Sequence, residues 1–575
     1  MLKLFRFLRP YCWGLFWVIL ILFAQSIAEL YLPTLMAEVV DNGMMKGDTG
    51  YILEYGSYML VVALASSFCA VTGSYLAARI GMGFGRDIRD NVFSRVESYS
   101  LHEFDRIGTA SLITRTTNDI VQMQTLVIMG LRFMVFAPIM CVGGIIMAYS
   151  KDKQLTLILA VVLPVMMFLI AILATYIVPL FKAMQIKLDK VNLVLRENLT
   201  GIRVIRAFNR LNAENKRFET ANRDLTDNAI RVNKIMAMVQ PVMMVFMNLT
   251  SVAIIWFGGI RISRDMMQVG DMMAFIQYAM QVMFSIIMVT VMFVMVPRAQ
   301  ASATRVNEVL DMEPGIVDPP QALAAGGQGG SVEFRDVTFS YPGAELPVIS
   351  NITFAANPGE VTAIIGGTGS GKSTIINLIP RFYDVDSGSV LVDGVDVRQV
   401  NQKDLRAKIG FVPQTPILFS GTVAENIRYG KLDATNEEII YAAEVAQADE
   451  FIAGLKDGYK SVIAQGGTNL SGGQKQRLAI ARALVRRPGI YILDDSFSAL
   501  DFRTDARLRA ALRKETAAST VIIVAQRVGT VMDADRIIVL DEGKIAGMGR
   551  HRELMDSCLV YREIVSSQLS VEETA

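Results

Sequence analysis

The fold is decided by the stretch Gly366-Gly367-Thr368-Gly369-Ser370-Gly371-Lys372-Ser373-Thr374. It lies between the apolar runs 361–365 and 375–379, a pattern that predicts a strand, a glycine-rich loop and a helix. The spacing Gly-x-x-x-x-Gly-Lys-Ser is typical of a phosphate-binding loop, whose backbone N–H groups donate to phosphate oxygens. In such a loop Lys372 reaches the β- and γ-phosphates and Ser373 holds Mg²⁺. The sequence therefore predicts a site for a nucleoside triphosphate with Mg²⁺.

Composition places this loop in a membrane protein of several domains. The chain has 575 residues and is 52% hydrophobic, which is high for a soluble protein. Its formal net charge of +1 gives no indication of a nucleic-acid partner. The spacing of the four cysteines fits neither a metal site nor a disulfide framework, so we interpret them as small apolar side chains: Cys12, Cys69, Cys141 and Cys558.

Six apolar segments in the first half of the chain are each long enough to cross a bilayer. Proline occurs in several of them, which membrane helices tolerate as kinks. The predicted membrane helices cover residues 12–36, 55–80, 126–149, 155–181, 235–260 and 272–297.

Lysine and arginine predict the orientation of these helices. Two connections are long and basic, those after the second and the fourth segment, and the latter carries twelve Lys or Arg residues. Basic connections stay in the cytoplasm. We therefore expect a protein of the cytoplasmic membrane, surrounded by lipid, with its N-terminus in the cytoplasm.

The same two connections have apolar positions at helical spacing over residues 84–106 and 182–234. We interpret them as cytoplasmic continuations of the membrane helices. Each then needs a turn, which we place near residues 101–108 and 201–210. These tips are the parts best placed to touch a cytoplasmic domain.

Glu29 is the only carboxylate within the six predicted spans. An ionisable group at membrane depth indicates a functional site by default, such as one for a cationic substrate or a proton. An interhelical hydrogen bond, or exposure to a water-filled cavity, explains the residue equally well.

The sequence divides into a transmembrane domain over residues 1–312, a linker rich in Pro, Gly and Ala over 313–330, and a second domain over 331–575. In the second domain short apolar strands alternate with helices, which is typical of an α/β domain with a largely parallel sheet. The predicted fold class is thus an α-helical membrane domain of six helices that extend into the cytoplasm, followed by an α/β phosphate-loop domain.

Three further positions in the second domain fit nucleotide chemistry. The apolar strand 490–494 ends in Asp494, where a carboxylate can hold Mg²⁺. Gln414 follows the apolar residues 411–413, where a polar side chain can reach Mg²⁺ or the attacking water. Tyr341 precedes the phosphate loop by about 25 residues and can stack on an adenine ring.

A second phosphate-binding element lies about 100 residues after the first. It is a Ser-Gly-Gly turn at the start of a predicted helix that runs through residues 479–483. The two elements need not serve the same nucleotide. The turn comprises Leu470, Ser471, Gly472, Gly473 and Gln474.

With these motifs the chain resembles the ATP-binding cassette (ABC) exporters over nearly its whole length. Tyr341 resembles the adenine-stacking residue of that family, and residues 366–374 resemble its Walker A motif. Gln414 matches the Q-loop glutamine, and residues 470–474 match the LSGGQ signature. Asp494 matches the Walker B aspartate, and residues 498–501 match the D-loop. The resemblance implies two nucleotide-binding domains that dimerise head to tail. Each ATP then lies between the Walker A of one chain and the signature of the other, and the helix tips act as coupling elements.

Two positions depart from the family pattern. The residue after the Walker B aspartate is usually a glutamate that acts as general base, but here it is Asp495. The switch position is usually histidine, but here it is Gln526. Asp495 is shorter than Glu by one carbon–carbon bond, about 1.5 Å. Gln526 cannot accept a proton at neutral pH, so we expect this chain's own Walker site to bind ATP and to hydrolyse it slowly.

Both departures together resemble one subunit of the bacterial heterodimeric multidrug exporters. The expected function is ATP-driven export of hydrophobic or amphiphilic compounds, with a second half-transporter as partner. Two alternatives stay open: a homodimeric exporter of lipid or peptide in which Asp495 suffices, and an ATP-sensing membrane regulator that hydrolyses little.

Overall fold

The computed structural model describes residues 1–324 and 329–568 and divides into two compact units. The first unit comprises Met1–Glu97 and Thr109–Met312, and the second comprises Ser98–Gly108 and Glu313–Ala575. Residues 325–328 of the predicted linker, and the last seven residues of the predicted 331–575 domain, lie outside the described residues.

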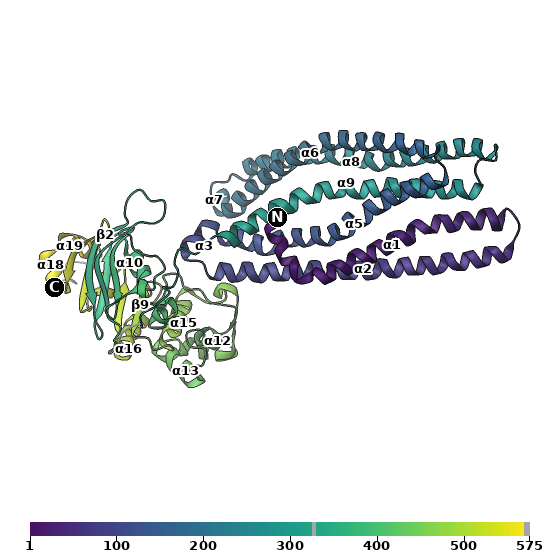
Figure 1. Ribbon diagram of the computed structural model, residues 1–575. Helices are drawn as coiled ribbons and strands as arrows, with labels where there is room; N and C mark the ends of the chain where they lie inside the picture. Colours follow the sequence, from purple (N-terminus) through teal and green to yellow (C-terminus); the bar gives the residue numbers. More distant parts are fainter. Residues whose placement is uncertain (325–328, 569–575) are drawn as a thin grey trace. The chain divides into compact units, whose positions relative to one another are not determined.

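The first unit consists of long helices (Figure 1). Among the described residues, six helical stretches are long and apolar enough to cross a membrane, as the sequence predicts. The elements are η1 (Leu2–Tyr11), α1 (Cys12–Glu38), η2 (Val39–Met44), α2 (Thr49–Glu97), α4 (Thr109–Thr114), η3 (Arg115–Asp119), α5 (Ile120–Lys151), α6 (Thr156–Thr200), α7 (Ile202–Ala207), α8 (Leu211–Ile262) and α9 (Val269–Asp311).

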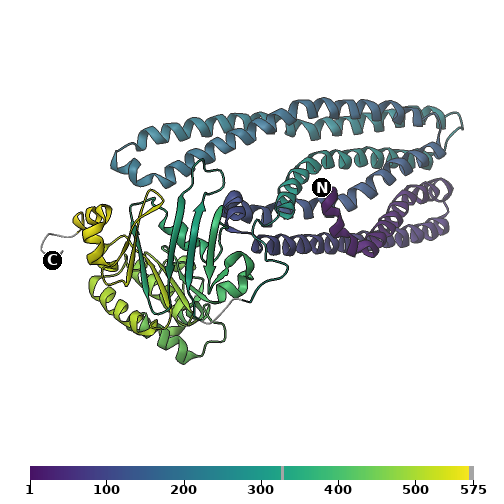
Figure 2. The same cartoon turned by 60° about the vertical axis from the view of Figure 1, so that its left-hand side comes forward.

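The helices continue through their prolines, for example Pro33 in α1 and Pro241 in α8. They pack in neighbouring pairs, of which α1 with α2 and α6 with α8 are plain in both views (Figures 1 and 2). With 49 and 52 residues, α2 and α8 exceed the roughly 20 residues that span a bilayer, so both extend beyond it.

The two predicted turns are confirmed, and each carries a short helix. Between α2 and α4 lies α3 (Leu101–Ile107), and between α6 and α8 lies α7. The segment that contains α3 belongs to the second unit, whereas α7 belongs to the first.

The second unit contains a mixed six-stranded sheet in the order β12-β11-β3-β10-β9-β6 and an antiparallel four-stranded sheet in the order β2-β1-β4-β5. The strands are β1 (Val332–Phe339), β2 (Ile349–Ala356), β3 (Val361–Gly366), β4 (Ser387–Val392), β5 (Val395–Asp396), β6 (Ile409–Val412), β7 (Gly421–Thr422), β8 (Val462–Ile463), β9 (Ile490–Asp494), β10 (Thr520–Val524), β11 (Arg536–Asp541) and β12 (Lys544–Gly549).

The larger sheet explains why distant motifs meet. β11, β3, β10, β9 and β6 are parallel neighbours, and only the edge strand β12 runs antiparallel within the described sheet. In register, Ile364 of β3 pairs with Val524 of β10, and Val524 pairs with Asp494 of β9. The loops that leave these strands therefore emerge along one edge, which is where ligands bind in open α/β sheets.

Helices cover this sheet and build a separate helical region around α15 (Figure 1). α15 packs on α12, α13 and β6, whereas α10 packs on β3 and β9. The helices are α10 (Lys372–Leu378), α11 (Gln402–Ala407), α12 (Val423–Arg428), α13 (Asn436–Val445), α14 (Asp449–Ala453), α15 (Gly472–Leu484), α16 (Phe502–Glu515), α17 (Val528–Val531), α18 (His551–Ser557) and α19 (Leu559–Ser566), with the short turns η4 (Val397–Gln399), η5 (Gly458–Lys460) and η6 (Gln465–Gly467).

Candidate nucleotide-binding site

The loop between β3 and α10 has the backbone that phosphate binding requires. Gly369 and Gly371 have φ angles of 82° and 94°, a region that favours glycine. At Gly371 a side chain would also collide, because its Cβ would lie 2.5 Å from Cγ2 of Ile349. Gly366, Gly367 and Thr368 complete the turn into α10, whose N-terminal N–H groups favour an anion.

Two polar side chains of this loop are buried and oriented for a ligand. Lys372 is 8% exposed, and its ammonium donates to the carbonyl oxygens of Gly366 and Gly367 at 2.9 and 2.6 Å. Burial lowers the pKa of Lys372, and this effect exceeds the opposite effect of the carboxylates of Asp494 and Asp495, which raise it. The hydroxyl of Ser370 is buried without a hydrogen-bond partner in the described structure. A phosphate group would accept from both side chains, so the residues present fit the nucleotide.

Two of the three magnesium-binding residues predicted from the sequence, Ser373 and Asp494, meet at the end of β9, whereas no contact among the described residues joins Gln414 to them. The hydroxyl of Ser373 hydrogen-bonds to the carboxylate of Asp494. Burial raises the pKa of Asp494, and the neighbouring Asp495 raises it further. A divalent cation would offset this cost of burying a carboxylate. When bound, ATP supplies a γ-phosphoryl group for transfer to water, and Mg²⁺ neutralises charge on its oxygens.

Asp495 lies directly beyond this pair, on a fixed backbone. Its φ of 45° is in the left-handed region, which aspartate tolerates better than most residues. Its N–H donates to the carbonyl oxygen of Val524 at 2.9 Å, and its own carbonyl oxygen accepts from the hydroxyl of Ser498 at 2.9 Å. The peptide groups on both sides of Asp495 are therefore held in place.

Gln414 and Gln526 extend from the same edge of the sheet. Gln414 follows β6, which pairs with β9, and its side chain is exposed. Gln526 follows β10 and is exposed too. The backbone at Gln526 is held by a residue that the sequence did not single out, Gln568 beyond α19. The amide of Gln568 donates to the carbonyl oxygen of Gln526 at 2.8 Å and accepts from the N–H of Val528 at 2.9 Å.

Tyr341 lies beside the phosphate loop. Its hydroxyl and that of Thr374 in α10 are hydrogen-bonded at 3.1 Å. Its ring packs edge-on against Phe339 and Tyr383, with centroids 5.0 and 5.3 Å away. These contacts orient a half-buried aromatic ring next to the loop, where an adenine can stack on it.

The Ser-Gly-Gly turn begins α15, as the sequence predicts, and no hydrogen bond or ion pair among the described residues joins it to Lys372. Ser471 is exposed and caps α15. Its hydroxyl accepts from the N–H of Gln474 at 3.3 Å, and its N–H donates to Oε1 of Gln474 at 2.9 Å. Gly472 and Gly473 lie against Ala499, so the turn packs on the loop that follows Asp495.

The segment Ser98–Gly108 is joined to the linker by a buried carboxylate. Glu103 caps α3 by accepting from the N–H of Ser100 at 2.8 Å and from the Ser100 hydroxyl, and it also accepts from the N–H of Gly315 at 3.2 Å. Although burial raises the pKa of Glu103, these hydrogen bonds hold it below its usual value. The sequence predicts a linker here but gives no sign that it is attached.

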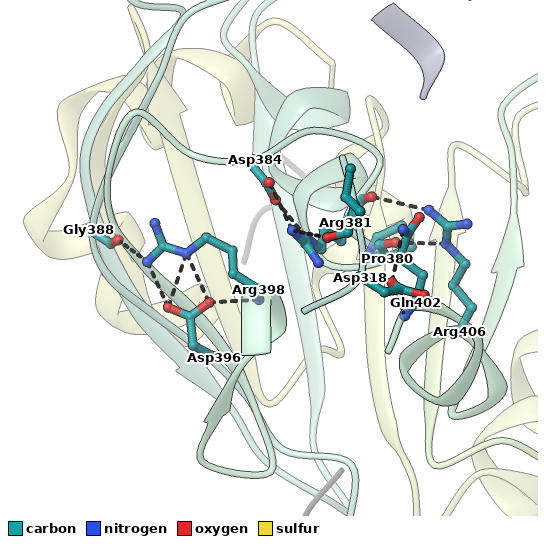
Figure 3. Close-up of polar contacts among 10 residues, drawn as sticks. Asp318, Pro380, Arg381, Asp384, Gly388, Asp396, Arg398, Gln402 and Arg406 are labelled. Carbon is teal, nitrogen blue, oxygen red and sulfur yellow. Dashed lines mark hydrogen bonds and ion pairs between the residues drawn. The ribbon is translucent and has the colours of Figure 1, made fainter. Parts of the chain in front are cut away.

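The linker is attached further along as well (Figure 3). Asp318 accepts from both the N–H and the side-chain amide of Gln402 at 3.0 Å. Arg381, which follows α10, pairs with Asp384 at 2.8 Å and donates to the carbonyl oxygen of Val317 at 3.4 Å. The described residues before the gap at 325–328 therefore follow the surface of the second unit and are not a free tether.

Comparison with known proteins gives a consistent result. Residues 15–286 match the family model of the ABC transporter transmembrane region, and residues 349–498 match a second family model, described as ABC transporter. An uncharacterized ABC transporter ATP-binding protein of Mycobacterium tuberculosis is 44% identical over 565 residues, which are 98% of this chain and 97% of that protein. The uncharacterized ABC transporter ATP-binding protein YfiB of Bacillus subtilis is 37% identical over 100% of this chain and 99% of its own.

The fold has a counterpart of known structure. A bacterial Atm1-family ABC exporter with ATP bound aligns with a TM-score of 0.80 and 26% identity, over 98% of this chain and 99% of that one.

Proposed function

The chain belongs to the ABC transporter family, and from this premise we propose that it is the subunit with the slow ATP site in a heterodimeric exporter of hydrophobic or amphiphilic compounds. It is an ABC half-transporter, with a multi-pass membrane domain fused to an ATPase domain that drives export.

The observation that carries the proposal is Asp495 at the position of the general base. A base must come within about 3 Å of the proton that it removes. Aspartate is shorter than glutamate by about 1.5 Å. The backbone of Asp495 is held by Val524 on one side and by Ser498 on the other, so it is not free to move forward and restore this reach.

Gln526 supports the same conclusion at the switch position. A carboxamide neither accepts a proton at neutral pH nor carries a positive charge next to the γ-phosphate. Lys372, Ser373 and Asp494 remain, so the site binds ATP with Mg²⁺ and lacks two of the groups that assist hydrolysis. General-base catalysis alone contributes about 10²–10⁴-fold to a rate.

The signature turn supports a partner that supplies the competent site. Ser471 caps α15, and Gly472 and Gly473 pack on Ala499. They complete an ATP site whose phosphate loop, glutamate and histidine belong to a second ABC half-transporter. This chain therefore contributes to hydrolysis through its signature and not through its Walker site.

The tip around α7 supports a second contact with the partner. α7 contains no buried residue, and large apolar side chains on and beside it are widely exposed: Leu199 (73%), Val204 (60%) and Phe208 (74%). Apolar side chains grouped in this way mark an interaction surface. Since the connection that carries α7 is strongly basic, it lies in the cytoplasm with the N-terminus and the ATPase domain.

Co-purification tests the proposal. The tagged chain, expressed from its native host, is expected to bring down a second ABC half-transporter with Glu and His at the positions of Asp495 and Gln526. The pair is expected to hydrolyse ATP faster when hydrophobic compounds are added. Recovery of a homodimer with brisk magnesium-dependent ATPase would instead support the homodimeric alternative.

A further inference from the structure

A polar cluster lies at membrane depth between α1, α2 and α9. The amide of Gln25 donates to Oε1 of Glu29 at 2.9 Å, and the hydroxyl of Ser66 in α2 approaches the same oxygen at 3.5 Å. From α9, Nε2 of Gln281 donates to the backbone carbonyl oxygen of Glu29 at 3.3 Å. α1 packs against both α2 and α9, so the cluster sits in a helix junction.

Pro33 explains the position of Gln281. In an α-helix the carbonyl oxygen of Glu29 would accept from the N–H four residues later. That residue is Pro33, which has no N–H, so the carbonyl is left without its helical partner. Neighbouring helices satisfy such groups in membranes. Gln281 does so with its NH₂ group, which leaves Oε1 of the same amide as an acceptor.

The cluster therefore has more acceptors than donors. Oε1 of Gln281 is buried and accepts no hydrogen bond from the described residues. Oε2 of Glu29 likewise accepts none in the described part of the chain, where no Lys or Arg forms an ion pair with this carboxylate. Oε1 of Gln281 is thus a buried acceptor that lacks a donor among the described residues, which is unfavourable, and Glu29 is a half-buried carboxylate for which the described residues supply no cation. Both deficits are removed by one group that is cationic and also carries N–H donors.

We propose that Glu29 and Gln281 form a recognition site for the protonated amine of an amphiphilic cargo. The carboxylate of Glu29 pairs with the ammonium, and Oε1 of Gln281 accepts one of its N–H groups. The apolar part of the cargo lies along the surrounding membrane helices. This inference rests on the proposed export function and names the chemical class of its cargo.

If Glu29 had a purely structural role, its hydrogen bonds would be needed but its negative charge would not. Gln25 lies on the same helix, and Ser66 is at the limit of hydrogen-bond distance, so neither contact requires a charge. Glutamine at position 29 would accept both hydrogen bonds equally well. Glu29→Gln therefore removes the charge and keeps the shape of the junction.

The test is binding of three related probes to the full-length chain, with any co-purified partner, in nanodiscs of neutral lipid. The probes are dansylcadaverine, which is a protonated primary amine at neutral pH, its N-acetyl derivative, which is neutral, and its trimethylammonium derivative, which is cationic without N–H. The variants are Glu29→Gln and Gln281→Leu. Glu38→Gln is the matched control, because Glu38 lies on α1 and is bonded to Asn42 and Tyr51 outside the cluster.

We expect Glu29→Gln to weaken binding of the primary amine at least tenfold, about 1.4 kcal/mol, and to leave the N-acetyl probe unchanged. Gln281→Leu should weaken binding of the primary amine more than it weakens binding of the trimethylammonium probe. Glu38→Gln should bind all three probes as wild type does. Equal affinity for the primary amine in wild type and Glu29→Gln would overturn the site, as would an equal loss of all three probes in either cluster variant.

A transport assay distinguishes failure of this binding site from failure of the proposed export function on which it rests. ATP-driven uptake of the N-acetyl probe into inside-out vesicles should persist in Glu29→Gln. If wild type moves none of the probes while the binding difference is present, then the site stands and the proposed function fails.

Discussion

Gln568 holds the backbone of Gln526, because its side-chain amide donates to the carbonyl oxygen of Gln526 and accepts from the N–H two residues later at Val528. The contact spans 42 residues and ties the C-terminal helix α19 to the loop at the switch position. A loop that would carry the catalytic histidine in a competent subunit is thereby fixed by two hydrogen bonds. We expect this loop to be less mobile than a free surface turn.

Gln568→Ala should loosen the switch loop without unfolding the domain. Each hydrogen bond is worth about 0.5–1.5 kcal/mol, so the loss is modest. Hydrogen exchange of the Val528 amide should accelerate roughly tenfold, because its acceptor is gone. Ser567→Ala is the matched control, since the hydroxyl of Ser567 donates to the carbonyl oxygen of Ile564 in α19 and, among the described residues, makes no contact with the switch loop. Unchanged protection of Val528 in Gln568→Ala would contradict the contact.

Glu103→Ala should release the linker from the segment Ser98–Gly108. The change removes the Glu103 half of the capping box of α3, so the N–H of Ser100 loses its acceptor, and it also frees the N–H of Gly315. Faster hydrogen exchange at Gly315 and weaker stimulation of ATPase by transported compounds are the expected results. Glu97→Ala, at the exposed end of α2, should alter neither. Full protection of Gly315 in Glu103→Ala would show that the linker is held without this carboxylate.

Restoring the two departed residues should activate this chain's own site. We expect the homodimer of the isolated chain to hydrolyse ATP slowly, and Asp495→Glu combined with Gln526→His to raise its rate by about 10²-fold or more. The gain should vanish when Lys372→Ala is added, which shows that it comes from this phosphate loop. A wild-type homodimer that already turns over briskly, and loses this activity with Lys372→Ala, would mean that Asp495 is an adequate base.

Much of this arrangement could be predicted from local sequence. The strand, loop and helix around Lys372 follow from an apolar run, positions that need glycine, and a second apolar run, all contiguous in the chain. Asp494 is predictable because a buried strand ends there, and parallel strands bring their carboxyl ends to one edge. The six membrane helices follow from length and apolarity alone.

The remainder depends on contacts between distant residues that leave no local signal. The sequence around Gly315 predicts a flexible linker residue. Its hydrogen bond to Glu103 joins positions that are 212 residues apart in the chain. Gln281 is one polar residue in an apolar helix, and its role becomes visible only when α9 is placed beside Pro33 and the carbonyl group of Glu29. Gln568 lies near the chain end, where sequence gives no reason to expect a partner.

The central claim is that this chain contributes its signature, and not its own base, to turnover. The direct measurement is steady-state phosphate release from the purified heterodimer with Ser471→Arg or Asp495→Asn in this chain and an unaltered partner. Ser471→Ala, which removes the cap of α15 without adding bulk, is the control for helix stability.

The account predicts that Ser471→Arg nearly abolishes phosphate release, while Asp495→Asn costs much less than the 10²-fold, about 2.7 kcal/mol, that loss of a working base produces. If Asp495→Asn is instead the more damaging change, then Asp495 is a working base and the claim is wrong.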